Sequence, residues 1–294
     1  MKEILFLDGS YICFYRYFAI IQWWGLANKD KDLNDPCNKQ EFITKFAETF
    51  IDKVKEIPKQ LKLDNPYIIL ARDCSRSNIW RTKIYPLYKT TRKDCGSNIY
   101  LSDCFELAYK ELFMKAGVDY VVSHDNLEAD DCIAILSQRL YNDYYIKDLQ
   151  IYIITSDTDY LQLVRDRITI FNLKYKNLIE SKGCFNNPDI DLFCKIVSGD
   201  KSDNIPGVFN RCGIKTAYKY YQNRELFNKK LDQDDSAKQR FHLNNILISF
   251  QSIPTDLTEQ FLETHLKKIE TIITSDTLDT LDTSDTINIT NTPN

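Results

Sequence analysis

The sequence predicts an α/β fold with a mostly parallel central sheet, followed by a helical region. Apolar runs of strand length alternate with helical segments up to about residue 188, and this alternation is typical of parallel sheets. Beyond that point the pattern changes to helix, turn and helix. With 294 residues, 43% of them hydrophobic, the chain can bury the core of one large domain and of a smaller one.

Four apolar runs predict the strands, at residues 3–7, 67–71, 119–123 and 151–155. Such uninterrupted runs are expected of strands that are buried on both faces of a parallel sheet. Helical patterns lie between them, for example at 102–117. Ser102 is the N-cap candidate of that helix and Gly117 its C-terminal glycine, and both favour a helix with these ends.

The C-terminal part divides into two further segments. Residues 189–268 carry helical patterns joined by short turns, and they predict a helical domain that follows the first domain at 1–188. Residues 269–294 are rich in Thr and Asp and contain no aromatic residue. This composition predicts a disordered acidic tail, because it offers too little apolar surface to form a core.

The overall composition excludes several classes of protein. A net charge of −4 and a pI near 5.5 exclude a uniformly basic nucleic-acid binder, although not a local basic patch. The nine cysteines form no C-x-x-C pair, so we expect buried thiols rather than zinc sites or disulfides. The sequence has no apolar run of about 18 residues and no signal-peptide pattern. We therefore expect a soluble, intracellular protein without a membrane partner.

Acidic residues follow each predicted strand, namely Asp8, Asp73, Glu128, Asp130, Asp131, Asp157 and Asp159. Because the carboxyl ends of parallel strands lie at one edge of a sheet, we expect these side chains to converge. Two like charges about 4 Å apart repel by roughly 4 kcal/mol at an effective dielectric near 20. Divalent cations such as Mg²⁺ offset this repulsion, and two such ions can activate water for phosphoryl displacement. Taken singly, each motif is equally compatible with a structural turn or an acidic helix start.

A basic segment follows the second strand. Residues 72–93 contain seven Lys or Arg and one Asp, interleaved with aromatic rings such as Tyr88. Basic side chains neutralise phosphates and aromatic rings stack on bases. We therefore expect this segment, including Arg76 and Arg81, to bind nucleic acid; a solvated basic helix is the alternative.

The segment SGDKSDNIPGVFNRCGIKTA at 198–217 indicates a helix-hairpin-helix element. Its tight turn lies at Pro206 and Gly207, and its second helix begins near Gly213. Backbone N–H groups at such a helix start suit a phosphate without reading the base. The candidate DNA contacts are Gly207, Gly213, Lys215 and Thr216, and Asp200 and Asp203 are further candidates for the metal cluster.

These motifs resemble those of the flap endonuclease and 5′–3′ exonuclease family, as in phage 5′ nucleases and the 5′-nuclease domain of bacterial DNA polymerase I. The matching stretches are LDGS, WR…YPLYKTTR, LEADD, TSDTDYLQL and GDKSDNIPGV…GIKTA, in the family's order over about residues 4–221. The resemblance implies a PIN-like domain with a short helical arch between Lys89 and Glu128, followed by a helix-two-turn-helix domain.

The resemblance also implies roles for individual residues. All nine acids named above match the family's metal-cluster carboxylates, and Asp157 and Asp159 are carried over as catalytic. Lys89 and Arg92 match residues that contact the scissile phosphate, and Tyr88 matches a ring that stacks on a nucleobase. Lys195 and Lys215 fall where basic residues approach the substrate. A K⁺ site is implied near Val208 and Gly213, although the hairpin reads RCG and is one residue longer than usual.

The implied function is a structure-selective 5′ nuclease that acts on DNA with a 5′ flap, a nick or a 5′ end. Two Mg²⁺ ions, replaceable by Mn²⁺, are its expected cofactors, and we expect a monomer that works in DNA replication or repair. Two alternatives stay open. One is a related nuclease for RNA or junctions; the other is a non-catalytic helix-hairpin-helix protein, against which the complete set of acids argues.

Overall fold

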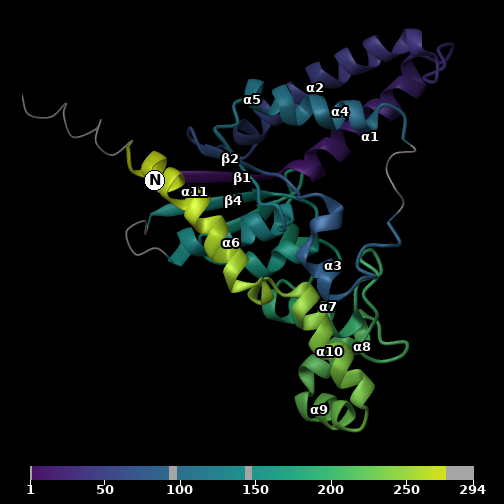
Figure 1. Ribbon diagram of the computed structural model, residues 1–294, viewed down its shortest axis with the longest axis vertical. Helices are drawn as coiled ribbons and strands as arrows, with labels where there is room; N and C mark the ends of the chain where they lie inside the picture. Colours follow the sequence, from purple (N-terminus) through teal and green to yellow (C-terminus); the bar gives the residue numbers. More distant parts are fainter. Residues whose placement is uncertain (1, 93–97, 143–147, 276–294) are drawn as a thin grey trace, which may run out of the picture.

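Five parallel strands form the central sheet, in the order β3-β2-β1-β4-β5. The computed structural model describes residues 2–92, 98–142 and 148–275, and Figure 1 shows helices on both sides of the sheet. The strands are β1 (Lys2–Asp8), β2 (Tyr67–Ala71), β3 (Tyr120–Val122), β4 (Leu149–Ile154) and β5 (Ile168–Phe171). The predicted fold class, a parallel α/β sheet followed by helices, is confirmed.

The sequence patterns miss β5, which lies at one edge of the sheet. Its four residues alternate between buried and half-buried positions. An edge strand of this kind lacks the continuous apolar run by which strands buried on both faces are found.

The two faces of the sheet are covered by different helices. Along β1, Leu5 and Leu7 point into one core with α1 (Gly9–Ala27), α2 (Lys39–Gln60) and α4 (Leu101–Leu107). Ile4 and Phe6 point into the other, with α6 (Ala129–Asn142) and α11 (Thr255–Ser275). This alternation follows from the period of two along a strand, and it fixes which helices cover which face.

The helix predicted at 102–117 is interrupted. α4 is followed by a π-helical turn (Ala108–Leu112) and by α5 (Phe113–Lys115), and the chain turns at Gly117 with φ +96°. The N-cap is Tyr100, with no side-chain cap, so the prediction of Ser102 as N-cap is wrong. Part of the segment expected to form the arch, residues 93–97, lies outside the described residues.

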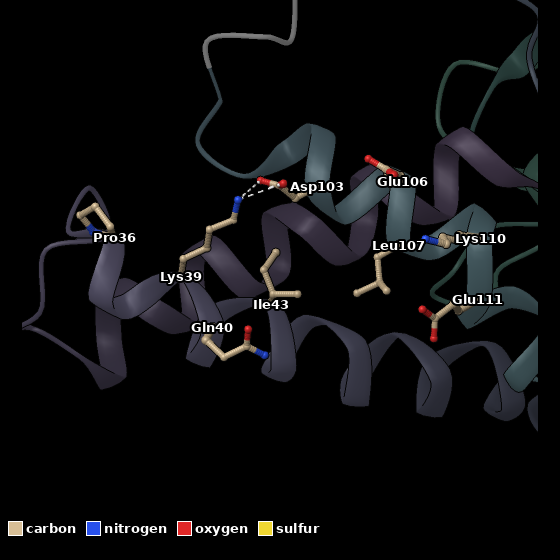
Figure 2. Close-up of a pocket in the computed structure, with 9 residues that line it drawn as sticks. All are labelled: Pro36, Lys39, Gln40, Ile43, Asp103, Glu106, Leu107, Lys110 and Glu111. Carbon is tan, nitrogen blue, oxygen red and sulfur yellow. Dashed lines mark hydrogen bonds and ion pairs between the residues drawn. The ribbon is translucent and has the colours of Figure 1, made fainter.

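A shallow groove of about 460 Å³ separates α2 from α4 (Figure 2). Lys39 and Asp103 form an ion pair of 2.9 Å across it, and both side chains are about half exposed. Ile43 and Leu107 also line the groove. α4 packs on α1 and α2 on this side of the sheet.

The C-terminal helices form a second core away from the sheet (Figure 1). They are α7 (Pro188–Ser198), α8 (Ile214–Gln222), α9 (Arg224–Asp232) and α10 (Asp235–Ile248). Phe193, Val208 and Phe227 are among the residues buried between them. Shorter segments are η1 (Pro36–Asn38), η2 (Arg76–Asn78), α3 (Trp80–Ile84), η6 (Thr158–Leu163), η7 (Leu178–Glu180) and η8 (Phe250–Ser252).

The last helix, α11, returns to the sheet and packs beside α6. It continues to Ser275, and Ile269 and Ile273 are buried in the core of the α/β domain. The predicted tail therefore starts too early at 269, because these two residues extend the apolar stripe of the helix at i, i+4 spacing. Residues 276–294 lie outside the described part of the chain.

The cysteines that the structure describes are all free thiols, and Cys13, Cys104, Cys132, Cys194 and Cys212 are buried. Most of them therefore act as small hydrophobic side chains, as expected. None of the helices in the described ranges is both long and apolar enough to cross a membrane.

Candidate active site

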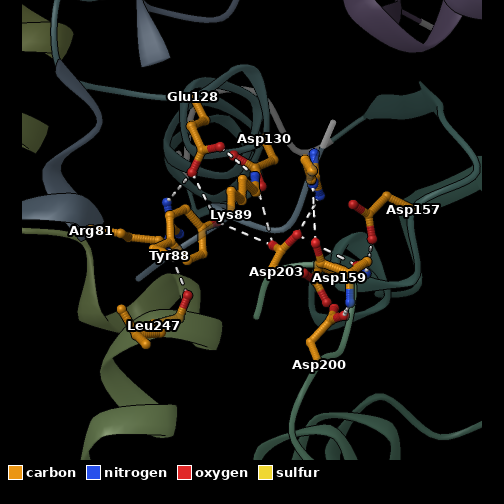
Figure 3. Close-up of polar contacts among 12 residues, drawn as sticks. Arg81, Tyr88, Lys89, Glu128, Asp130, Asp157, Asp159, Asp200, Asp203 and Leu247 are labelled. Carbon is orange, nitrogen blue, oxygen red and sulfur yellow. Dashed lines mark hydrogen bonds and ion pairs between the residues drawn. The ribbon is translucent and has the colours of Figure 1, made fainter. Parts of the chain in front are cut away.

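Acidic side chains gather at the carboxyl edge of the sheet (Figure 3). Asp8 ends β1 and caps α1, where it accepts a hydrogen bond of 3.1 Å from the Tyr11 amide. Asp73 follows β2, and Asp157 precedes η6 after β4. Parallel pairing brings these strand ends together, since the register of β1 joins it directly to both β2 and β4.

Two groups of carboxylates are close enough to share a metal ion. In one group Glu128, Asp130 and Asp131 have ligand atoms within 4.8 Å of one another; Glu128 directly precedes α6, and the two aspartates lie in its first turn. The other has the same spacing and joins Asp159 to Asp200 and Asp203. The last two residues come from the loop after α7, so the second group spans both parts of the fold.

Asp73 is oriented by two donors. Its carboxylate accepts the Ser10 hydroxyl at 2.5 Å and the Ala129 amide at 2.8 Å. Asp8 in turn accepts the Thr155 hydroxyl at 3.0 Å. These bonds connect the ends of β1, β2 and β4 to the first turn of α6, so the acids are held by the strands that precede them.

Burial and mutual repulsion disfavour the charged forms of several acids. Burial, reinforced by Asp73, raises the pKa of Asp8 to about 7. Burial, reinforced by Asp157, also raises the pKa of Asp159 to about 7 despite Lys195. The pKa of Asp130 lies well above its usual range, through burial and then Asp131 and Glu128. Clusters of oxygen ligands with excess negative charge fit hard divalent cations.

Three basic side chains lie among the acids. Lys89 contacts Glu128 and lies 3.7 Å from Asp203. Arg92 pairs with Asp203, and Lys195 pairs with Asp159 and, at 2.9 Å, with Asp200. The structure thus places the predicted phosphate-contacting cations between and beside the two carboxylate groups, and Arg92 is the most exposed of them at 47%.

Arg81 does not face the solvent. Its side chain is 2% exposed and makes a bidentate ion pair with Asp131, with two contacts of 2.8 Å. It also donates to Glu128 at 3.1 Å and to the Leu247 carbonyl at 2.8 Å. The prediction that Arg81 binds DNA is contradicted, because its guanidinium is used inside the protein.

Asp131 and Tyr88 also differ from expectation. Asp131 is fully buried and accepts hydrogen bonds from Arg81 and, at 2.9 Å, from the Trp80 indole. Its oxygens are therefore the least free to bind a metal. Tyr88 is 4% exposed and donates to Glu128 at 3.1 Å or Asp203 at 3.2 Å. In this arrangement its ring cannot stack on a nucleobase, and its hydroxyl joins the two carboxylate groups instead.

The remaining candidate DNA contacts lie outside the carboxylate groups. Arg76 donates to the carbonyls of Lys89 and Arg92, so it supports the turn that carries those cations. Gly213 is the N-cap of α8, and Lys215 and Thr216 are exposed in its first turn.

Gly207 approaches the end of α7 closely. A Cβ atom at this position would lie 2.9 Å from the Ser198 carbonyl, so any larger residue would push the turn away from α7. The glycine therefore has a packing role in the turn, whatever it contacts outside the protein.

Sequence reasoning missed three polar residues that support the site, namely Ser10, Gln162 and Asn244. Gln162 donates to the Asp159 carbonyl at 3.0 Å, and Asn244 is fully buried beneath the loop of Asp200 and Asp203. The sequence signal for Asn244 is its spacing, because it lies on the same face of α10 as the buried Ala237 and Ile248.

Comparison with known proteins agrees with this geometry. The family model described as 5′-3′ exonuclease, N-terminal resolvase-like domain, matches residues 3–188. A 5′-3′ exonuclease of Buchnera aphidicola (subspecies Schizaphis graminum) is 28% identical over 74% of this chain and 68% of its own length. A protein of Enterobacteria phage T4 named Ribonuclease H is 25% identical over 83% of this chain and 84% of its own length.

Solved structures share the fold. The flap endonuclease of bacteriophage T5, in a pseudo-enzyme–product complex with DNA and metal ions, superposes with a TM-score of 0.61. It is 17% identical, and the match covers 90% of this chain and 98% of that one. Since the family model spans well over half of the chain and the acids lie where the fold converges, this protein belongs to the 5′–3′ exonuclease family.

Proposed function

We propose that this protein is a divalent-metal-dependent, structure-selective 5′ nuclease that hydrolyses DNA at a 5′ flap, a nick or a 5′ end. The observation that carries the proposal is the pair of carboxylate groups at one sheet edge, joined by Lys89 and Tyr88. A structural cluster gains nothing from the raised pKa values of Asp8 and Asp159, whereas a metal site uses the same excess of negative charge.

Two Mg²⁺ ions, replaceable by Mn²⁺, are the proposed cofactors. The residues that would hold them are Asp8, Asp73, Glu128, Asp130, Asp157, Asp159, Asp200 and Asp203. When bound, such ions supply an activated water and stabilise the oxygens of an in-line displacement. Asp131 contributes indirectly, by holding Arg81 beside Glu128.

The chain's own cations act on the phosphate. Lys89 and Arg92 stand at the carboxylate groups, where they can hold the scissile phosphate and stabilise the negative charge that develops on it. Lys195 balances the charge of Asp159 and Asp200. The exposed start of α8 with Lys215 and Thr216 would contact the duplex backbone, and the carbonyls near Val208 and Gly213 would hold a K⁺ ion there.

The protein would act inside the cell, as a monomer, in DNA replication or repair. Support for a monomer is that a single chain supplies both carboxylate groups. A second candidate substrate is RNA paired with DNA, which the phage relative named Ribonuclease H favours. Parallel assays on matched DNA and RNA strands distinguish the two candidates.

The first test is Asp157→Asn on a 5′-end-labelled flap duplex with Mg²⁺ or EDTA. We expect the parent to cut near the flap junction only with metal, and the variant to lose cleavage by at least about a hundredfold while it still binds the flap. Asp64→Asn, at an exposed position before β2, is the control and should cut normally. Equal cleavage by the Asp157 variant would overturn the assignment of the site.

A further inference from the structure

The C-terminal end of α10 is connected to both carboxylate groups by side-chain hydrogen bonds. Arg81 donates to the Leu247 carbonyl at 2.8 Å, and Gln162 donates to the Ile248 carbonyl at 2.9 Å. The last carbonyls of a helix have no partner within the helix, so these two side chains satisfy groups that would otherwise need water. Figure 3 shows Leu247 on α10 directly beside Arg81.

Each of these donors also contacts a carboxylate segment. Arg81 holds Asp131 and Glu128 in the first group. Gln162 donates to the backbone carbonyl of Asp159 in the second group, and its own carbonyl accepts the Phe250 amide at 3.0 Å. The end of α10 is therefore a common anchor for the start of α6 and for the chain after β4.

Asn244 extends this anchor to the third segment, the loop that carries Asp200 and Asp203. Its amide donates to the Ile196 carbonyl at 2.9 Å and to the Pro206 carbonyl at 2.8 Å. These two residues precede and follow the loop.

The loop itself is closed by a pair of backbone hydrogen bonds between Asp200 and Ile205, at 2.9 and 2.7 Å. In a longer helix the Asp200 amide would donate to the Ile196 carbonyl, four residues earlier. Because that amide is used in the pair with Ile205, the Ile196 carbonyl in the last turn of α7 accepts its hydrogen bond from Asn244 instead. Arg240, one turn earlier on α10, adds a hydrogen bond of 2.8 Å to the Val208 carbonyl.

Keeping Asn244 in this core has a cost. The residue is fully buried, and its Oδ1 atom has no hydrogen-bond partner among the described residues. A buried polar atom without a hydrogen-bond partner lowers the stability of the folded protein. A leucine would fill a similar volume without that cost, so packing alone does not explain an amide here, whereas its two donated hydrogen bonds do.

We propose that Asn244 is a positioning residue that fixes Asp200 and Asp203 relative to the first carboxylate group through α10. The proposal rests on the proposed nuclease function, in which both groups hold metal. Residues that orient metal ligands typically change metal affinity by about ten- to a hundredfold when they are replaced. Loss of the Asn244 amide should therefore weaken metal binding at the second group and leave the first group unchanged.

The test uses the full chain with Asn244→Leu, which keeps the volume and removes both donated bonds. Asn244→Ala is the second variant, and Asn245→Leu, at the exposed neighbouring position, is the matched control. Backbone amide exchange is measured by mass spectrometry without metal, and Mn²⁺ binding by electron paramagnetic resonance titration. Flap cleavage is then measured across a range of Mn²⁺ concentrations.

In the Asn244 variants we expect faster exchange at 199–208 and unchanged exchange at 128–133. One of two Mn²⁺ sites should weaken by roughly tenfold, and excess Mn²⁺ should restore the cleavage rate. A general loss of stability would instead speed exchange at 128–133 as well. Unchanged exchange at 199–208, or equal weakening of both Mn²⁺ sites, overturns the proposal. If the parent neither binds Mn²⁺ nor cuts, the nuclease function fails, while the exchange data still decide whether Asn244 positions the loop.

Discussion

At the scale of the residue, Arg81 is a buried cation that is compensated almost entirely inside the protein. It pairs with Asp131 and Glu128, donates to a helix C-terminal carbonyl and lies 4.5 Å from the Trp80 ring. A surface ion pair contributes little to stability. Removing one partner of a buried pair is costly, because the remaining charge is left buried without a partner or solvent. This residue therefore matters for folding more than for contact with substrate.

We predict that Arg81→Met lowers the free energy of unfolding by about 3–5 kcal/mol, because Asp131 would stay buried without its partner. Urea denaturation followed by circular dichroism measures the change. Lys83→Met, at an exposed position on the same short helix, should stay within about 0.5 kcal/mol of the parent. A similar, small loss for both variants would mean that Arg81 is not the compensating charge.

A second prediction at this scale concerns pH. The carboxyl groups of Asp8 and Asp159 have pKa values of about 7 in the folded protein, against about 4 in an unfolded chain. Between these values the folded state binds more protons, so their contribution to stability falls as pH rises from about 4 to about 7. Asp200, whose pKa is lowered to about 2, makes its full contribution already above about pH 4.

The contribution of Asp8 is measured by comparing the parent with Asp8→Asn in urea denaturation at several pH values in EDTA. From pH 4 to 7 the parent should lose stability relative to the variant. The comparison is needed because His265, whose pKa is lowered mainly by burial, acts in the opposite direction. A constant difference between the two proteins across this range would contradict the raised pKa of Asp8.

At the scale of the element, α11 shows how a C-terminal helix becomes part of an N-terminal core. Ile269 is fully buried against the face of the sheet that α6 covers. His265, one turn earlier, bonds to Tyr120 at 2.9 Å and to the Ser123 carbonyl at 3.0 Å. These contacts attach the helix to β3 and to the chain that leads into the acidic start of α6.

We predict that Ile269→Ala lowers the free energy of unfolding by about 2–5 kcal/mol, through lost burial and the cavity that remains. Glu263→Ala, at an exposed position of the same helix, should change it by no more than about 0.5 kcal/mol. Thermal and urea unfolding of both variants provide the measurement. An unchanged stability in Ile269→Ala would mean that α11 is not held against the sheet in solution.

At the scale of the whole molecule, charge is distributed unevenly. The net charge is −4, and the acids of the site are concentrated at one sheet edge, whereas Lys215 is exposed at the start of α8. DNA binding by a protein of this charge depends on such local positive regions and therefore on salt.

Lys215→Ala should weaken binding to flap DNA and reduce the slope of log affinity against log salt by about 0.9, the value for one phosphate contact. Fluorescence anisotropy in EDTA at several salt concentrations measures this slope without cleavage. Lys115→Ala removes the same charge on α5, where Lys115 pairs with Glu111, and it should leave the slope unchanged. Equal slopes for all three proteins would remove Lys215 from the DNA-binding surface.

The parallel sheet and the edge at which its acids meet follow from the amino-acid sequence alone. Each buried strand is a local apolar run, and Asp8, Asp73 and Asp157 follow such runs within two residues. Parallel connections then leave a single edge for the strand ends, so convergence follows from chain order. The edge strand β5 and the end of α11 could not be predicted from local patterns, because their burial depends on neighbours far along the chain.

The partners of the charged side chains, in contrast, are set by the folded chain. Arg81 stands in a basic stretch, and its sequence context predicts a DNA contact. The fold instead places it between Asp131 and the end of α10, where its hydrogen-bond acceptor, the Leu247 carbonyl, is 166 residues away in sequence. Asn244 likewise has a role only because α10 passes beneath the loop of Asp200 and Asp203. Residue types and spacing fix local conformation, whereas burial and hydrogen-bond partners are set by segments that meet only after the chain has folded.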